Sequence, residues 1–430
     1  MINYINSILN DTLKLVAIDS VQAEPSSLSP FGDGVGLCIK EVLSIAKSLG
    51  FETRDEQGYY GTATIGQGEE FGILGHVDVV PYKDQTWTKK PLGEIINGVL
   101  YGRGVLDDKG PIMCCLYAVY KLIQEGYTPK KKIKFIFGGN EESGWKCIER
   151  YNQIESMPEN GFSPDADFPV IFSEKGILHL KVSLDKPEEL ISISAGSRPN
   201  MVIDKCLATI DRELPKSTDI NISSSIDEGK TNIKTYGMAA HGSTPEKGDN
   251  AFLHTLNYLS ETLGGVYTKL NNLLSSITGE GLGINCEDNK SGALSLNVGV
   301  VKIENQRLNL YLDIRYPVTF KFEDILNKAE NAFSFAKVEV VSHQAPLYID
   351  KEDKLVQTLL KSYNKVMGTN VEPIAIGGGT YARALKHGVA FGPVFPGKES
   401  CAHEADEHFS VEDFEKAFDI YYEAIKVLCF

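Results

Sequence analysis

The chain has 430 residues, of which 42% are hydrophobic and 23% are charged, and its formal net charge is −15. This length and composition can bury a full core and allow two domains. The acidic balance argues against a nucleic-acid surface, and no apolar run approaches the ~18 residues of a membrane span, so we expect a cytoplasmic protein without nucleic-acid or membrane partners.

The first 65 residues are expected to contain two helices, a long loop and a strand. Helical patterns cover residues 2–18 and Val35–Leu49, and a strand pattern covers Tyr60–Ile65. The first helix lacks the basic segment and the cleavage site of a signal peptide, which agrees with a cytoplasmic location. The loop Ser20–Gly34 is rich in Pro, Ser and Gly, and we interpret it as a connector rather than a mobile segment beside a site.

Three predicted strands each end at a cluster of histidine or acidic residues. Strand Glu70–Leu74 leads into GHVDVVP, Leu100–Gly104 into DDKG, and Lys131–Phe137 into GGNEESG. A helix over Pro111–Glu125 separates the last two, and this alternation predicts an α/β fold with a mixed, mostly parallel sheet covered by helices. Because open α/β sheets bind ligands beyond the carboxyl ends of their strands, we expect the three clusters to meet there.

Residues 177–345 are expected to form an inserted α+β domain, and residues 1–176 and 346–430 to form the catalytic domain around it. Apolar and polar residues alternate from Arg307 to Arg315, which is typical of a strand with one face on a core. One sheet and two helices are predicted for the inserted domain. The helical patterns lie at Asn250–Leu263 and Phe322–Phe335.

Alternating structure returns after residue 345. Helices are predicted at Asp353–Met367 and Tyr381–His387, and strands at Pro373–Ile376 and Val389–Phe395.

Three further features are expected elsewhere in the chain. Glu141 and Glu142 should open a helix that ends near Tyr151, and Cys114 and Cys115 should lie in the core. The last helix should begin at Ser410, where Asp413 completes a capping-box-like start.

Five imidazole and carboxylate side chains could bind metal: His76, Asp107, Glu142, Asp165 and His403. Such ligands suit zinc or manganese. Five ligands are too many for one tetrahedral ion but suit two ions that share a bridging carboxylate, and such pairs activate water and polarise a carbonyl. Taken singly, each residue could instead be a surface acid or a hydrogen-bonded histidine. For Asp165 and His403, spacing alone does not decide between these.

Two further acids beside these residues have separate expected tasks. Glu141 could act as general base while its neighbour Glu142 binds metal. Alternatively, the pair could simply complement the positive end of a helix, and the two interpretations are compatible. Asp78 would hydrogen-bond the outer nitrogen of His76 and fix its tautomer.

Five segments stand in the order seen in a known clan of metallopeptidases: GHVDVVP, YGRGVLDDKGP, GGNEESGW, SPDADFPVI and MAAHGSTP. From about residue 10 to the C-terminus, the chain resembles the PepV-type dipeptidases of the di-metal aminoacylase/carboxypeptidase/carnosinase family. The resemblance implies a zinc-exopeptidase-like domain with a lid. It also implies two divalent ions per chain, Zn²⁺ before Mn²⁺ or Co²⁺, and hydrolysis of dipeptides or short peptides by metal-activated water with a glutamate base. Alternatives are an N-acyl amino acid deacylase (desuccinylase or deacetylase type) and, more remotely, a non-catalytic peptide-binding relative.

The resemblance also implies roles for residues of the catalytic domain. The metal ligands would be His76, the bridging Asp107, Glu142, Asp165 and His403, with Glu141 as general base and Asp78 as orienting residue. The peptide bond after Asp107 would be cis. Asp167 and Glu174 stay open as alternatives to Asp165. The last ligand lies in ESCAHEADE, where Cys401 replaces the usual methionine and only His403 and Glu407 keep the pattern.

In the inserted domain, the resemblance implies that His241 and Asn200 stabilise the oxyanion of the reaction. Arg315 would clamp the substrate carboxylate, with an ordinary surface ion pair as the alternative. Gly378 and Thr380 belong to the turn GGGTYAR, which would contact substrate or serve chain geometry alone. The lid is intermediate in size between those of dimeric relatives and those of monomeric PepV-type enzymes, and a monomer is favoured over a homodimer. The other histidines and both tryptophans are interpreted as structural: His179, His254, His343, His387, His408, Trp87 and Trp145.

Overall fold

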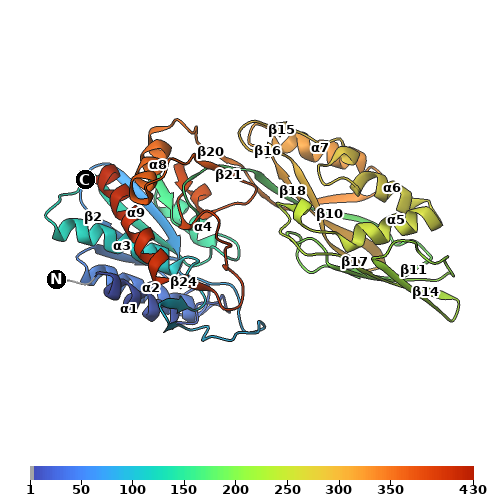
Figure 1. The fold of residues 1–430 in the computed structure, drawn as a ribbon, viewed down its shortest axis with the longest axis horizontal. Helices are drawn as coiled ribbons and strands as arrows, with labels where there is room; N and C mark the ends of the chain where they lie inside the picture. Colours follow the sequence, from blue (N-terminus) through green and yellow to red (C-terminus); the bar gives the residue numbers. More distant parts are fainter. Residues whose placement is uncertain (1–3) are drawn as a thin grey trace. The chain divides into compact units, whose positions relative to one another are not determined.

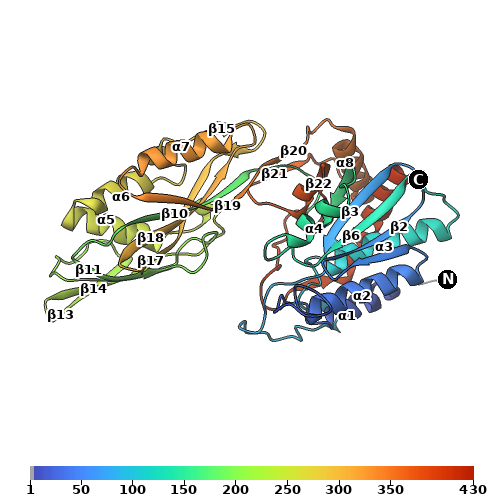
Figure 2. The same cartoon turned by 180° about the vertical axis from the view of Figure 1, so that it is seen from behind.

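The computed structural model describes residues 4–430, which form two compact units (Figures 1 and 2). Unit 1 comprises the chain up to Phe172 together with Ile349–Ile374 and Thr380–Phe430, and unit 2 comprises Ser173–Tyr348 and Ala375–Gly379. The start of the predicted helix over residues 2–18 lies outside the described residues. Within residues 4–430, no helix is both long and apolar enough to cross a membrane.

Unit 1 is built on a mixed sheet. Its strands are β1 (Glu52–Glu56), β2 (Tyr60–Ile65), β3 (Glu70–His76), β6 (Lys132–Gly138), β7 (Asn160–Ser163), β9 (Ile171–Glu174) and β22 (His387–Ala390). They lie in the order β1-β2-β6-β3-β7-β22-β9. The central strands β6, β3, β7 and β22 are parallel, and the pairs on either side are antiparallel. This arrangement confirms the predicted fold class.

Helices cover this sheet (Figure 1). They are α1 (Tyr4–Val16), α2 (Asp33–Ser48), α3 (Lys109–Gln124), α4 (Lys146–Ile154), α8 (Lys354–Met367) and α9 (Val411–Cys429). α3 packs against α1, α9 and β3, while α2 packs against β1 and β2. Cys114 and Cys115 are fully buried in the resulting core, as predicted. The cap of α9 is also confirmed, because the Ser410 hydroxyl accepts the N–H of Asp413 at 3.1 Å.

Unit 2 contains an antiparallel sheet covered by helices. The strands are β10 (Gly176–Asp185), β11 (Leu190–Ala195), β12 (Lys205–Ile210), β13 (Ile222–Asp227), β14 (Lys230–Tyr236), β17 (Ser295–Glu304), β18 (Arg307–Tyr316) and β19 (Lys337–Gln344), in the order β13-β14-β12-β11-β17-β18-β10-β19. The helices are α5 (Ala251–Leu263), α6 (Val266–Leu274) and α7 (Phe322–Ala332). Apolar residues of β10 and β18 share one core with all three helices. The sequence did not predict α6.

Short elements complete both units. They are the strands β4 (Glu94–Ile96), β5 (Val99–Tyr101), β8 (Ala166–Asp167), β15 (Glu287–Asp288), β16 (Gly292–Ala293), β20 (Leu347–Tyr348), β21 (Ile374–Ile376), β23 (Pro393–Val394) and β24 (His408–Ser410), and the 3₁₀ turns η1 (Pro245–Lys247), η2 (Glu280–Leu282) and η3 (Tyr381–Ala384). β24, β5 and β4 form a small sheet, and β8 pairs with β23. The expected helix over Tyr381–His387 is therefore only the turn η3, and the expected strand over Val389–Phe395 is split between β22 and β23.

The helix that was expected to open at Glu141 begins only at Lys146, which corrects that prediction. Residues 141–144 form a turn instead, and Trp145 has a left-handed backbone with φ of 62°. Asn140 holds this turn, since its main-chain oxygen accepts the N–H of Trp145 at 2.8 Å and its side chain accepts the N–H of Lys146 at 3.0 Å. Glu141 and Glu142 therefore lie outside the first turn of α4.

Candidate metal centre

Three strand-end segments of unit 1 place His76, Asp107 and Glu142 together. His76 ends β3, Asp107 lies in the loop after β5, and Glu142 lies in the turn after β6. One ligand atom from each residue lies within 4.8 Å of the other two. β3 and β6 are parallel neighbours, so their carboxyl ends open at the same edge of the sheet.

Asp107 lies between two histidines. Its Oδ1 is 2.9 Å from Nε2 of His76, and its Oδ2 is 2.9 Å from Nε2 of His403. The ring of His403 is also 3.1 Å from the carboxylate of Glu142, and that of His76 is 3.6 Å from Oδ2 of Asp165. The two oxygens of Asp107 thus face two separate donor groups. A carboxylate that bridges two cations needs this arrangement.

Asp165, which was predicted with Asp167 and Glu174 as alternatives, contacts the cluster at His76. Its carboxylate faces His76, as described above. Asp167 belongs to β8, which pairs with β23, and Glu174 is the fully buried last residue of β9. The contact with His76 supports Asp165 as the ligand among these three acids. The peptide bond between Asp107 and Asp108 is cis, as the resemblance implied.

Burial and charge shift the pKa values of this cluster strongly. Burial lowers the pKa of His76, but its carboxylate partners outweigh burial and hold the pKa well above the usual value. The same balance raises the pKa of His403 to about 11. Burial raises the pKa of Asp107, yet the two histidines outweigh burial and hold this pKa well below its usual range. For Glu142, burial and the charge of Asp107 raise the pKa to about 7. Buried carboxylates concentrated in this way require positive charge nearby.

The donor set fits two divalent cations. Every donor is an imidazole nitrogen or a carboxylate oxygen, the types that bind zinc, manganese and cobalt. Asp107 adds a carboxylate whose two oxygens face different groups and could hold two cations. The fit thus rests on the positions of side chains as well as on their identities.

Asp78 connects His76 to the turn that carries the two glutamates. Nδ1 of His76 is 3.0 Å from the main-chain oxygen of Asp78 and 3.6 Å from its carboxylate. An N–H on Nδ1 therefore donates mainly to the main chain, which leaves Nε2 directed at Asp107. The carboxylate of Asp78 accepts the N–H groups of Glu141 and Glu142, both at 3.1 Å. This second contact was not expected from the sequence.

Glu141 lies beside the ligand cluster. Its Oε1 accepts the indole N–H of Trp145 at 3.2 Å. Trp145 packs edge-on against Tyr381, which packs in the same way against the ring of His76. Burial raises the pKa of Glu141 well above its usual value. Trp145 was interpreted as a packing residue, and the structure shows that it also orients Glu141; its place in GGNEESGW was the available signal.

The sequence also missed a buried ion pair that supports the loop of Asp107. Nη1 of Arg103 donates to Oε2 of Glu407 at 2.5 Å, and the other oxygen of Glu407 accepts the N–H groups of Gly104 and Leu106, both at 3.0 Å. Arg103 is 2% exposed and Glu407 is fully buried. The pair joins the loop after β5 to the segment just before β24.

Gln85 extends this network to His403. It accepts Nη2 of Arg103 at 2.6 Å and donates to the main-chain oxygen of His403, also at 2.6 Å. Asp406, which follows closely, accepts the N–H of Thr88 at 2.8 Å. The loops that carry Asp107 and His403 are therefore positioned by the same set of contacts. Arg103 and Glu407 each lie in a segment quoted for the resemblance, whereas Gln85 had no signal in the sequence.

Glu407→Ala should lower the free energy of unfolding by about 3–5 kcal/mol, because it leaves the buried guanidinium of Arg103 without its charged partner. Urea unfolding followed by circular dichroism measures this change. Glu412→Ala is the matched control, since it removes an exposed acid of the first turn of α9 that pairs with Lys416, and it should change the unfolding midpoint only slightly. Equal midpoints for the two variants would contradict the role given to Glu407.

The loop Ser20–Gly34 lies beside the glutamate turn. Oε1 of Gln22 accepts the side-chain amide of Asn140 at 3.1 Å and also the hydroxyl of Ser143. The main-chain oxygen of Ser20 accepts the N–H of Val79 at 3.2 Å. The loop connects two helices, as expected, but it also borders the candidate site.

Four predicted residues belong to unit 2 and are described within that unit: Asn200, His241, Arg315 and Gly378. Nδ1 of His241 accepts the N–H of Ser243 at 3.2 Å and lies 2.7 Å from its hydroxyl. In neutral His241 the proton is therefore on Nε2, which can act as a donor. The main-chain oxygen of Asn200 accepts the N–H of Gly242 at 2.8 Å, so Asn200 supports the same loop.

Arg315 is 4% exposed and is not part of a surface ion pair. Its Nε and Nη2 donate to the two oxygens of Asp313 at 2.7 and 2.9 Å. Its Nη1 donates to the main-chain oxygen of Gly377 at 3.3 Å, within the glycine-rich turn that continues to Gly378. Asp313 thus occupies one edge of the guanidinium and fixes its plane. Thr380 belongs to unit 1 and caps η3 by accepting the N–H of Ala382 at 3.2 Å.

Known proteins resemble this chain over nearly its whole length. The profile of peptidase family M20/M25/M40 matches residues 72–427. A putative dipeptidase of Bacillus subtilis, YtjP, is 36% identical over 97% of this chain and 96% of its own. Among solved structures, human carnosine dipeptidase 1 (TM-score 0.60, 15% identity) covers 98% of this chain and 95% of its own. The B. subtilis YXEP protein, described as a dinuclear metal-binding peptidase, has a TM-score of 0.55 at 10% identity over 99% of this chain and 98% of its own.

Proposed function

The chain belongs to peptidase family M20/M25/M40, and we propose that it is a metal-dependent dipeptidase that hydrolyses the peptide bond of dipeptides. The observation that carries this proposal is the position of Asp107 between His76 and His403. The name of the full-length relative YtjP supports the choice of dipeptides. We further propose a monomer. A cytoplasmic location is proposed as well, since all eight cysteines are free thiols, as is usual in a reducing compartment.

Two divalent ions are proposed for the centre, with Zn²⁺ preferred and Mn²⁺ or Co²⁺ compatible with the same donors. His76, Asp107 and Asp165 would hold one ion, and Asp107, Glu142 and His403 the other. When bound, such ions polarise a carbonyl group and lower the pKa of water. The description of YXEP as dinuclear supports this stoichiometry.

Glu141 is proposed as the general base. It would take a proton from the attacking water and later give a proton to the leaving amine, as a positioned carboxylate can. The indole of Trp145 supports this role because it fixes one oxygen of the carboxylate. Asp78 contributes by holding the N–H groups on either side of that turn.

Residues of unit 2, which we propose as the lid, would complete the reaction. The N–H on Nε2 of His241 would donate to the oxyanion, and Asn200 would assist at the same oxygen. The guanidinium of Arg315 would bind the substrate carboxylate, and the turn that holds Gly378 and Thr380 would contact the substrate. These roles come from the family resemblance. Because some of the proposed catalytic residues belong to the lid, closure of the lid would precede turnover.

Metal analysis combined with chelation is the most direct test of the metal-dependent function. Dialysis against a chelator should abolish dipeptide hydrolysis, and re-addition of Zn²⁺, Mn²⁺ or Co²⁺ should restore it as two ions bind per chain. Elemental analysis and activity are measured on the same samples. Full activity after complete removal of metal would contradict the proposal.

A substrate panel distinguishes a dipeptidase from an N-acyl amino acid deacylase, which is the alternative in the same chemistry. Dipeptides with a free α-amino group should be cleaved with a higher kcat/KM than N-acetyl and N-succinyl amino acids. Preferential cleavage of the N-acyl compounds would favour the deacylase. A protein that binds dipeptides but releases no product would favour the non-catalytic alternative.

Arg315→Lys should raise KM for dipeptides by about 10- to 100-fold, since a hydrogen bond to a charged group contributes ~1.5–3 kcal/mol. The same dipeptides with a C-terminal amide should lose much less. Arg307→Lys is the matched control, because it alters an exposed arginine of the same strand that pairs with Asp185. An equal loss for acid and amide substrates would show that Arg315 does not recognise the carboxylate.

A further inference from the structure

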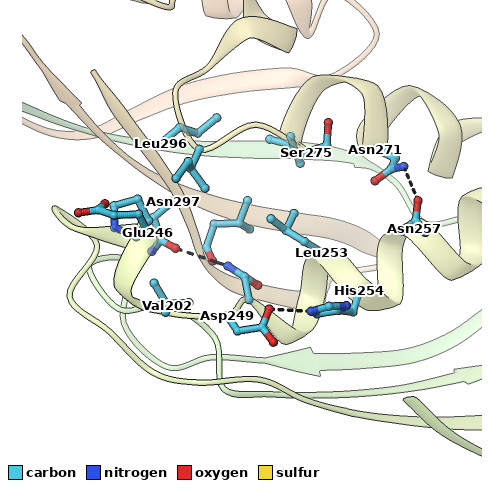
Figure 3. A pocket seen from close by; sticks show the side chains of 16 residues that line it. Val202, Glu246, Asp249, Leu253, His254, Asn257, Asn271, Ser275, Leu296 and Asn297 are labelled. Atoms are coloured by element: carbon cyan, nitrogen blue, oxygen red, sulfur yellow. Dashed lines mark hydrogen bonds and ion pairs between the residues drawn. The ribbon is translucent and has the colours of Figure 1, made fainter. Parts of the chain in front are cut away.

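The segment Met238–Asn250 of unit 2, which carries His241, borders a cavity of about 410 Å³ (Figure 3). Pro245, Glu246 and Gly248 of the segment line the cavity, together with residues of α5, α6 and β17. This part of the segment therefore does not rest on a filled core. Main-chain bonds from Ala240 and Gly242 to Val202 and Asn200 hold the first half of the segment, and the half that borders the cavity depends on contacts at its far end.

Main-chain hydrogen bonds close the base of the segment. Met238 and Asp249 exchange two N–H···O bonds of 2.8 and 2.9 Å. The N–H of Gly237, just before the segment, donates to the main-chain oxygen of Asp204 at 2.8 Å. Asp249 is thus the point at which the far end of the segment joins its beginning, immediately before α5.

His254 of α5 contacts a carboxylate with each of its ring nitrogens. Nε2 lies 2.6 Å from Oδ1 of Asp249, a contact drawn in Figure 3, and Nδ1 lies 2.6 Å from Oδ2 of Asp219. A neutral imidazole has one N–H and could donate to only one of these carboxylates. The two short contacts therefore fit the imidazolium form, although the side-chain amide of Asn221 also lies 3.2 Å from Nε2.

The charges around His254 favour that form. Burial lowers its pKa, but the hydrogen bonds to Asp249 and Asp219 outweigh burial, so the pKa lies above the usual value. His254 is in the first turn of α5, where the helix dipole opposes a positive charge, so the carboxylates must provide the stabilisation. Asn221 adds to this group by donating to the second oxygen of Asp249 at 3.3 Å.

We propose that His254 is a positioning residue, whose imidazolium ties Asp249 to Asp219 and so holds the segment that presents His241 to the substrate. The inference rests on the proposed function of His241. The cavity leaves room for the segment to shift once this tie is broken. Loss of the proton would break it, so the order of the segment should be complete below the ordinary pKa of histidine and should decline as pH rises through the raised pKa of the folded state.

Two variants test the tie from its two ends. His254→Asn removes the imidazolium, and Asp219→Asn removes the carboxylate that does not belong to the segment. Each should lower kcat by about tenfold at pH 7, because small misplacements of a catalytic group are costly, while KM and bound metal stay unchanged. The double variant should be no slower than either single one, as expected of residues that act together.

The matched control is His387→Asn, which breaks a histidine–carboxylate pair with Asp353 at 3.2 Å in unit 1 and should leave kcat unchanged. Amide hydrogen exchange of the full-length protein adds a readout that does not depend on activity. Residues 238–250 should lose protection in His254→Asn at pH 7, and in the wild type as pH rises, while β17 and β18 keep theirs. Unchanged protection and unchanged kcat would overturn the inference. If the wild type cleaves no dipeptide, the proposed function fails, but exchange still decides the role of His254.

Discussion

Glu141→Gln should lower kcat for dipeptides by a factor of about 10²–10⁴, the usual contribution of a general acid–base group, while both metal ions stay bound. Glutamine keeps the shape of the side chain and can still accept the N–H of Trp145, now 3.2 Å from Oε1 of Glu141. It cannot take a proton from water. Steady-state kinetics and elemental analysis of the same preparation measure the two effects.

Glu142→Gln provides the contrast, because Glu142 is a proposed ligand and Glu141 is not. Its carboxylate lies 3.1 Å from Nε2 of His403 and belongs to the cluster with His76 and Asp107. The Glu142 variant should lose metal as well as activity. Full activity of Glu141→Gln would refute its role as base, and loss of metal in that variant would show that it is a ligand instead.

Local patterns were sufficient to predict that His76 and Glu142 lie close together. β2 has the predicted bounds, and β3 and β6 were found because buried parallel strands are short apolar runs with clear ends. Since the carboxyl ends of parallel strands share an edge, the proximity of His76 and Glu142 follows from topology. The fold class could therefore be predicted, and so could the edge of the sheet at which to look.

The turn at Glu141 could not be predicted from local sequence. Residues 141–151 contain good helix formers, but the carboxylate of Asp78 binds the N–H groups of Glu141 and Glu142 from another strand end. The side chain of Asn140 accepts the N–H of Lys146, and α4 begins only at this residue. These tertiary contacts outweigh the helix propensity of the residues, which is worth only ~0.1–0.7 kcal/mol per residue.

Contacts between distant segments account for the other omissions. Arg103 and Glu407 are 304 residues apart in the chain, and neither pattern nor spacing links them. His254 was interpreted as structural, and that remains correct for its local contacts. Its pairing with Asp219, 35 residues earlier, becomes visible only when the fold brings the loop before β13 beside α5. Long-range polar pairs of this kind leave no periodic signal.

Asp107→Asn should abolish the binding of two ions and, with it, the hydrolysis of dipeptides. The carboxylate offers one oxygen to the group of His76 and the other to that of His403, both at 2.9 Å. An asparagine has one oxygen and an NH₂ group, which cannot bind a cation. Removal of an outer partner of a metal site already costs about 10–100-fold in affinity, so loss of a bridging ligand should cost more. Titration calorimetry with Zn²⁺ measures both sites.

Asp165→Asn and Asp167→Asn distinguish the loss of a metal ligand from the general effect of removing a negative charge near the site. The Asp165 variant should lose the ion held with His76 and keep the one held with Glu142 and His403, because its carboxylate faces only the first group. The Asp167 variant should retain two ions and full activity. Two ions and normal turnover in Asp107→Asn would contradict a bridging role. Loss of metal on Asp167→Asn would instead show that the neighbouring acid is the ligand, in disagreement with the distance to His76.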